Sequence, residues 1–507
     1  MQAGSHQTGG RKRTEIYRQE NFRPLLICLM LAMFMFAMNQ TVLSTALPTI
    51  AGDLGGADRI AWIVSGFVLA STAFMPVFGS LSDAMSHRAL MSISIVLFTL
   101  GSVAAALSVS IDMLIAARLV QGVGGGALLV LPQAVLADAI VARERAKYAG
   151  AFASVWAVAS VAGPLVGGWF TDGPGWPWAF WMNVPLGAIT LLLTLRYVRG
   201  PVARTRVRFD VLGSVSLAGA TTGVVLLATW AGTTFAWGSP QIVILFLSTI
   251  ACAVVFFLAE MRATHPVMSL QIFRSRTFLL ATGSGMLAGG IAMFGVLTYL
   301  PVFLQMVLSL GATQAGLALI PMIGSILVSS SLTGIIVART GRYKLIPIIG
   351  MLAVTASLVL LGSMNAQTTV LEACLFSALM GAGLGTSAQL LLLVVQNALP
   401  TSMVGSATAA NNYFRQVGAA IGIAAIGSAF TSRLAVSFGQ SDGLPPSIDF
   451  TDLTPTLYAG LPETAQTLIA DLYASALQPF FLMLAPLGAV SVLLLLFLER
   501  RPLSTTH

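Results

Sequence analysis

Long apolar segments alternate with short polar loops along almost the whole chain. A helix that crosses the apolar core of a bilayer needs about 20 consecutive, mostly apolar residues. Fourteen segments meet this requirement, at residues 24–47, 60–80, 89–110, 113–137, 147–170, 178–197, 211–232, 239–259, 278–303, 314–337, 345–364, 369–395, 405–432 and 476–498. The pattern predicts an all-α, polytopic membrane protein with fourteen transmembrane helices.

Composition agrees with this class and excludes several others. Of the 507 residues, 56% are hydrophobic and only 9% are charged, whereas soluble proteins carry about 25% charged residues. The cysteines (Cys28, Cys252 and Cys374) lie inside apolar segments, which argues against a disulfide framework. The four histidines are scattered over loops and termini, so we expect no metal site. No Gly-Lys pair occurs, which excludes the phosphate-binding loop of ATP-driven pumps.

The distribution of basic residues predicts the orientation in the membrane. Lys and Arg concentrate in the cytoplasmic loops of membrane proteins. With the N-terminus inside, only Arg59, Arg118, Arg415 and Arg433 of the 26 Lys and Arg residues fall outside the inner tails and loops. We therefore expect a multi-pass protein of the cell (inner or plasma) membrane with both termini in the cytoplasm. The net charge of +8 then reflects topology, and we expect no nucleic-acid partner.

Glycines recur at a fixed offset of 255 residues, which indicates an internal repeat. Gly79, Gly150, Gly163 and Gly167 recur as Gly334, Gly405, Gly418 and Gly422. We predict two six-helix halves, 24–199 and 277–498, separated by two inserted helices with their flanking loops at 200–276. Residues 1–23 and 499–507 are predicted cytoplasmic tails, and 433–475 is a predicted external loop. Duplicated halves around a central cavity are a transporter architecture.

Four motifs, in a fixed order, carry a resemblance to a known family. They are RLVQGVGG from Arg118, AGPLVGGW with Gly163, Pro164, Gly167 and Gly168, WPWAFWMNVPLG from Trp176, and NNYFRQVGAAIG from Asn411. In this order they resemble the fourteen-span drug:proton antiporters of the major facilitator superfamily, over nearly the whole chain. The resemblance implies a transporter, not an enzyme, that exports amphipathic small molecules by alternating access. A proton gradient would replace any cofactor, and a periplasmic adaptor is a candidate partner beside the lipid bilayer.

The loop after the second span resembles the cytoplasmic gating loop of that family. The matching residues are Gly79, Asp83 and Arg88 in the first copy, and Arg339, Gly341 and Arg342 in the second. Ala338 occupies the acidic position of the second copy. The resemblance implies that Asp83 latches one conformation, paired either with a helix N-terminus or with another inner arginine. The alternative is a solvated loop turn.

Polar residues inside the spans predict a substrate and coupling cavity. Its candidate residues are Asn39, Gln40, Arg118, Gln121, Asn411, Asn412 and Arg415. A guanidinium or amide within the membrane is costly unless it is paired, so such residues point to a functional site. Asn39 stands where the family usually has an acid, which weakens both proton coupling through the first span and a preference for cations. We expect neutral or anionic amphiphiles bound by two arginines. The alternative is that these residues only tie helices together.

Asp112 and Glu372 are the leading titratable candidates if protons drive transport. They lie at the predicted outer ends of the fourth and twelfth spans. Alternatively, both are acids at helix starts, where they interact favourably with the helix dipole. The Gly163-Pro164 motif favours proton-driven export, whereas Asn39 favours an uptake carrier or facilitator without proton coupling. The oligomeric state is not predicted.

Overall fold

The computed structural model describes residues 19–44, 46–54, 59–198, 210–232, 234–263, 266–439 and 462–499. Within these ranges the chain is helical, and its one isolated β-bridge joins Ala231 to Phe235. Most of the predicted N-terminal tail, the loop 199–209, the central part of the predicted external loop and the predicted C-terminal tail after 499 lie outside the described residues.

The first half and the inserted pair account for eight of the predicted spans. Their helices are α2 (Gln19–Thr41), α3 (Leu47–Leu54), α4 (Ile60–Ala84), α5 (His87–Ala106), α6 (Ile111–Ala139), α7 (Ala142–Arg145), α8 (Ala149–Asp172), α9 (Trp178–Trp181), α10 (Asn183–Tyr197), α11 (Val211–Trp230) and α12 (Pro240–Arg262). The short α3, α7 and α9 are attached to the ends of longer helices.

The second half contains the remaining six spans. Its helices are α13 (Arg276–Ser284), the π-helical segment η5 (Gly285–Ala292), α14 (Met293–Met306), α15 (Ala312–Leu317), α16 (Ile320–Thr340), α17 (Leu345–Leu361), α18 (Val370–Ala398), α19 (Val404–Gly439) and α21 (Glu463–Leu496). Thirteen described helices, some including adjoining turns, are long and apolar enough to cross a membrane, and α17 is a shorter apolar helix. The predicted fold class is thereby confirmed.

Two predicted boundaries were wrong. The first span ends at Thr41 rather than 47, because the chain there enters a 3₁₀ turn at Val42–Ser44 before α3 begins at Leu47. The predicted loop 433–475 is shorter, since α19 continues to Gly439 and α21 begins at Glu463. With 34 residues, α21 is about 50 Å long at 1.5 Å per residue, well beyond the roughly 30 Å apolar core.

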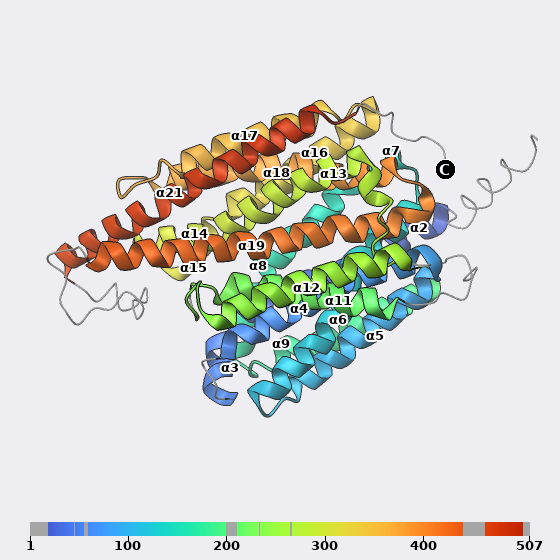
Figure 1. Cartoon of the computed structure of the whole chain (residues 1–507), viewed down its shortest axis with the longest axis horizontal. Helices are drawn as coiled ribbons and strands as arrows, with labels where there is room; N and C mark the ends of the chain where they lie inside the picture. The colour runs from blue at the N-terminus through green and yellow to red at the C-terminus, as the bar shows by residue number, and fades with distance from the viewer. Residues whose placement is uncertain are drawn as a thin grey trace, which may run out of the picture.

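The two halves lie side by side, each around its own apolar core. In Figure 1 most of the first half (blue to cyan) lies below the second half (yellow to red), and α11 and α12 (green) lie along the boundary between them. Phe36, Phe67 and Phe98 are buried in the first half, and Phe278 and Phe481 are buried in the second. Helix α11 packs against α4, α19 and α12, so the inserted pair contacts both halves.

The repeated glycines contact the opposite half in a reciprocal arrangement. A Cβ atom on Gly79 would overlap the side chain of Ala409 and the carbonyl oxygen of Gly405, both on α19. One on Gly334 would overlap the carbonyl of Ala146, and Gly150 lies against α16. Thus the second span of each half meets the fifth span of the other half through glycines. This exchange is what two similar halves related by a pseudo-two-fold axis would give, and it supports the predicted repeat.

Glycines also let α6 pack closely between α4 and α5. Gly122 and Gly126 face backbone atoms of α4, and Gly124 faces backbone atoms of α5. Close backbone approach through small residues is a common basis of helix packing in membranes. The Gly122–Gly126 cluster therefore serves packing, as expected for a segment inside a span.

Replacing Gly126 with alanine should destabilise the first half. The new methyl group would overlap the backbone carbonyl of Ser71 on α4, and overpacking of this kind costs about 1–3 kcal/mol. We expect a lower apparent melting temperature of the purified protein in detergent. Gly168→Ala is the matched control, because nothing lies within 4 Å of a Cβ there. Equal melting temperatures for the two variants would contradict this interpretation.

Candidate functional site

Arg118 lies at the centre of a buried polar network in the first half. Its side chain is 1% exposed. Nε donates to the Ile63 carbonyl at 2.9 Å, and Nη1 donates to Gln121 Oε1 at 2.6 Å and to Asn39 Oδ1. The guanidinium also lies 4.3 Å from the centre of the Phe67 ring, a cation–π geometry. The network therefore satisfies the buried charge without an acidic partner.

The same network extends to two further helices. Gln121 donates to the Ser102 hydroxyl of α5, and Asn183 of α10 donates to that hydroxyl at 3.1 Å. The network therefore links α2, α4, α5, α6 and α10. These contacts favour the alternative that Arg118 ties helices together, because they bind its guanidinium within a buried network. Ser102 and Asn183 were not among the predicted site residues, because they bear no charge and lie far apart in the sequence.

Gln40 differs from its neighbour Asn39. It is half-buried and forms no side-chain hydrogen bond with any other described residue, whereas Asn39 is 1% exposed and accepts a bond from Arg118. Of the two amides in the first-span motif, Asn39 thus takes part in the structural network. Gln40 keeps its hydrogen-bonding groups available.

Arg415 of α19 has a different environment from Arg118. Its side chain is half-buried, and Nη2 donates to Asn412 Oδ1 at 3.2 Å. Asn412 in turn donates at 2.9 Å to Gln133 Oε1 of α6, in the first half. Asn411 accepts a bond from the Thr282 hydroxyl at 3.2 Å. Of the two predicted asparagines, Asn412 therefore lies beside Arg415 and also bridges the two halves.

Asp83, at the end of α4, caps the N-terminal end of α19 in the opposite half. Its carboxylate accepts bonds from the backbone N–H groups of Gly405 and Ser406, both at 2.8 Å, and from the Ser406 hydroxyl at 2.5 Å. Free N–H groups and the helix dipole make a helix N-terminus a favourable site for a carboxylate. Asp83 is therefore paired with a helix N-terminus rather than with another inner arginine.

At the equivalent junction of the internal repeat, an arginine binds the helix terminus in place of an acid. Arg143 of α7 donates to the carbonyl of Ala338 at 2.9 Å and to that of Arg339 at 2.8 Å, at the C-terminal end of α16. Ala338 is the repeat equivalent of Asp83. Gly341, with φ of +67°, ends this helix in the left-handed conformation that glycine favours. Both junctions therefore bind a charged side chain to the terminus of a helix from the opposite half.

We call the end of the bundle that contains Arg143, Arg145, Arg339 and Lys344 the basic end. There Arg145 Nη1 donates to Gln396 Oε1 of the opposite half at 2.5 Å. A pocket beside this contact is lined by residues of both halves, among them Gln133, Arg145, Ser330 and Gln396. The halves are thus closed against each other at the basic end, through polar contacts that a movement of one half could break.

The remaining gating-loop residues lie at the surface of the basic end. Arg88, Arg339 and Arg342 are exposed, and the backbone N–H of Arg342 donates to the Thr340 hydroxyl. A buried pair that was not predicted lies at the same end. His87 Nδ1 is 3.8 Å from Asp138 Oδ2, and His87 is buried. The position of His87 next to Arg88 in the gating loop was the only sequence signal for it.

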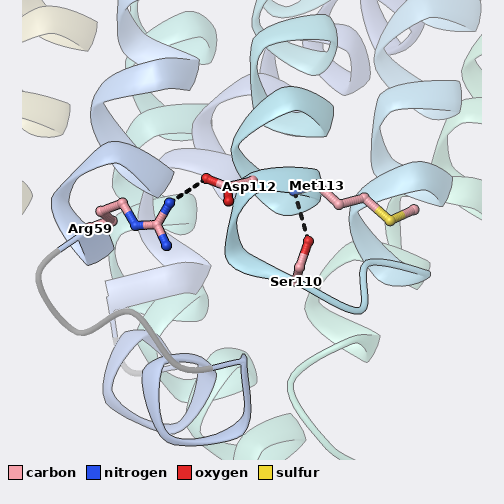
Figure 2. A network of polar contacts seen from close by, with 4 residues as sticks. All are labelled: Arg59, Ser110, Asp112 and Met113. Atoms are coloured by element: carbon pink, nitrogen blue, oxygen red, sulfur yellow. Dashed lines mark hydrogen bonds and ion pairs between the residues drawn. The ribbon is translucent and has the colours of Figure 1, made fainter.

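Asp112 lies in the first turn of α6 and forms an exposed ion pair. Figure 2 shows Arg59 Nη1 beside Asp112 Oδ1, at 2.6 Å, and the Ser110 side chain accepting a bond from the Met113 N–H. The side chains of Arg59 and Asp112 are 45% and 71% exposed. Asp112 thus has the environment of an acid at a helix start, which is the alternative to a role in proton coupling.

Glu372 lies in the first turn of α18 and is also exposed. Its carboxylate accepts bonds from the N–H and the hydroxyl of Thr369, at 2.7 and 2.9 Å, and the Thr369 hydroxyl accepts one from the Glu372 N–H. This reciprocal arrangement is a capping box. Like Asp112, Glu372 has the environment of a residue that starts a helix.

We expect Asp112→Asn and Glu372→Gln to retain transport driven by a pH gradient, to within about twofold, since exposed helix-start acids contribute only modestly. Substrate uptake by inverted membrane vesicles, with and without an imposed gradient, measures this. Loss of the response to the gradient in either variant, with normal protein levels, would identify that acid as the coupling group instead.

The four residues of the Gly-Pro motif lie on α8 with different surroundings. A Cβ on Gly163 would overlap the Thr41 hydroxyl, which donates to the Ala159 carbonyl at 2.8 Å. The Gly167 carbonyl accepts a bond from the Thr171 hydroxyl, Pro164 is half-buried, and Gly168 faces open space. The first-span and fifth-span motifs therefore meet at Gly163 and Thr41.

Comparisons with known proteins agree with this architecture. The sequence profile described as Major Facilitator Superfamily matches residues 29–423. An uncharacterized MFS-type transporter of Mycobacterium tuberculosis is 34% identical over 487 residues, which cover 95% of this chain and 70% of that protein. The multidrug transporter protein MdtP of Bacillus subtilis is 31% identical over 416 residues, 82% of this chain and 76% of that protein.

A solved structure supports the same fold. The proton:xylose symporter XylE, bound to 6-bromo-6-deoxy-D-glucose, aligns with a TM-score of 0.63 at 16% identity, covering 95% of this chain and 97% of that chain. At that identity the likeness concerns the fold alone. Taken with the profile match over residues 29–423, the chain belongs to the Major Facilitator Superfamily and is a multi-pass membrane transporter rather than an enzyme.

Proposed function

We propose that this transporter exports amphipathic small molecules, such as drugs, antibiotics or metabolites, across the cell membrane in exchange for protons. The multidrug transporter of Bacillus subtilis, 31% identical, supports the substrate class. The Gly163-Pro164 motif supports the antiport direction by resemblance. The energy source is the proton gradient, and the lipid bilayer is the chain's immediate environment.

The basic end faces the cytoplasm in this proposal, as the positive-inside rule requires. The structure then represents the state that is closed toward the cytoplasm. The observation that carries the proposal is the pair of reciprocal junctions, Asp83 on the α19 terminus and Arg143 on the α16 terminus. Each junction joins opposite halves by a few polar bonds, so rocking of the halves breaks both together and opens the cytoplasmic side.

Proton coupling needs a titratable group that responds to this movement. Asn39 cannot titrate, and both Asp112 and Glu372 are exposed helix-start residues. The acids at the closure are better placed, since Asp83 bonds directly to the opposite half and Asp138 lies beside His87. We therefore propose that coupling acts at the basic end rather than through the first span.

A second candidate function is an uptake carrier or facilitator of the same fold without proton coupling. It is favoured by one observation: the Asn39 oxygen, where the family usually has an acid, accepts a bond from Arg118. In that case the network of Arg118 replaces a coupling site by a permanent structural contact. Alternating access would remain, but substrate would only move down its own gradient.

Uptake of a fluorescent substrate into inverted vesicles, with an imposed pH gradient, separates the two candidates. Export by antiport predicts accumulation inside the vesicles against the substrate gradient, abolished by a protonophore. A facilitator predicts equilibration that ignores the protonophore. Asn39→Asp should be compared with the wild type in the same assay. Equilibration without accumulation in the wild type would overturn proton antiport.

A further inference from the structure

Arg415 is a charged residue deep in the second half. It follows Val404, the first residue of α19, by about 16 Å along the helix axis at 1.5 Å per residue. Such a position is near the middle of a roughly 30 Å apolar layer. A guanidinium at this depth carries a large free-energy cost unless it is paired, and it normally faces the bundle interior or a water-filled cavity.

The protein itself supplies little pairing for this charge. Nη2 has one bond, of 3.2 Å, to Asn412, while Nε is buried without a partner. No carboxylate among the described residues lies within ion-pair distance of Arg415, since the ion pairs found there are Arg59–Asp112 and His87–Asp138. Arg118, by contrast, has three hydrogen bonds and a ring beneath it.

Part of the Arg415 side chain is accessible, and it faces the π-helical segment η5. Its side chain is half-buried although Asn412 and Gln416, on the same helix, are buried. The facing wall is the π-helical segment η5, where a Cβ on Gly289 would lie 3.7 Å from the Arg415 Cδ and one on Gly290 would lie 2.7 Å from the Arg415 carbonyl. Short π-helical segments occur frequently at functional sites.

We propose that Arg415 binds an anionic group of the transported molecule, a carboxylate, sulfonate or phosphate ester at one end of an amphiphile. This inference rests on the proposed function and specifies its substrate class. The planar guanidinium fits such oxyanions with two parallel hydrogen bonds, and the anion supplies the charge partner that the described residues lack. Arg118 does not share this role, because its side chain is buried and both Nε and Nη1 already donate within the protein.

Binding to the purified full-length transporter in detergent tests this assignment. Two probes share one fluorophore and differ in the charged end: dansyl-taurine ends in a sulfonate, and dansyl-cholamine in a quaternary ammonium. We expect the wild type to bind the sulfonate more tightly. Arg415→Gln should weaken sulfonate binding by about 10- to 100-fold, as expected for lost hydrogen bonds to a charged group, without weakening binding of the cation. Arg415→Lys should lie between.

Arg433→Gln is the matched control, because Arg433 is an exposed arginine on the same helix. It removes the same charge and should leave both affinities unchanged. Tighter or equal binding of the cation by the wild type, equal losses for both probes in Arg415→Gln, or the same loss in Arg433→Gln would overturn the proposal. Selective binding without outward transport in vesicles would support the Arg415 assignment and contradict export, so the two failures are distinguishable.

Discussion

Asp83→Asn is expected to reduce transport at least tenfold while leaving the amount of folded protein unchanged. The carboxylate accepts three bonds from Gly405 and Ser406 at the start of α19. Hydrogen bonds to a charged group contribute about 1.5–3 kcal/mol each. Loss of about 3 kcal/mol from one conformation changes the balance between two conformations by more than 100-fold. The amide keeps the shape but lacks the charge that favours the helix N-terminus.

Two measurements check this result. Transport in inverted vesicles gives the rate, and size-exclusion chromatography in detergent gives the folded fraction. Glu144→Gln, which removes an exposed acid at the same end, should transport normally. Wild-type rates in Asp83→Asn would show that the cap of α19 is not a latch, and aggregation of that variant would assign Asp83 to folding instead.

Arg118→Ala should have the largest effect on stability. It removes the guanidinium from a fully buried site and leaves the Asn39 and Gln121 oxygens and the Ile63 carbonyl without this donor. Disrupting a buried charged network by removing one partner typically costs about 3–5 kcal/mol. We expect little folded protein, or a melting temperature in detergent lowered by many degrees.

Arg415→Gln is the informative comparison for Arg118→Ala. Arg415 has a single hydrogen bond of 3.2 Å and a half-buried side chain, so the variant should melt close to the wild type. Differential scanning fluorimetry of both purified variants measures this contrast. A stable, folded Arg118→Ala protein that fails only in transport would contradict the structural role and return Arg118 to the substrate site.

Much of the fold was predictable from the sequence because the bilayer imposes a simple length and polarity requirement. Each of the fourteen predicted spans has a helix in the described residues, and the offset between Gly79 and Gly334 correctly indicated equivalent positions in the two halves. The errors occurred where hydropathy does not report backbone geometry. The first helix gives way to a 3₁₀ turn after Thr41, and α21 extends beyond its apolar part.

The candidate site was predictable in its residues but not in its contacts. Arg118 and Arg415 were predictable as the intramembrane cations, yet hydropathy treats them alike. Their difference arises because Asn39, Gln121 and the Ile63 carbonyl bind Arg118. Ser102, which accepts bonds from Gln121 and Asn183, extends this network without a sequence signature. Likewise, Arg143 compensates for the missing acid at Ala338 through bonds to main-chain carbonyls.

The central claim is that the halves alternate between closure and opening at the basic end. Double electron–electron resonance between spin labels on Lys147 and Arg342, both exposed at that end and on opposite halves, tests it most directly. The three native cysteines would first be replaced. We predict one short distance for the closed state and a second, longer distance whose share changes with pH or substrate. A single unchanged distance under conditions of active transport would contradict the account.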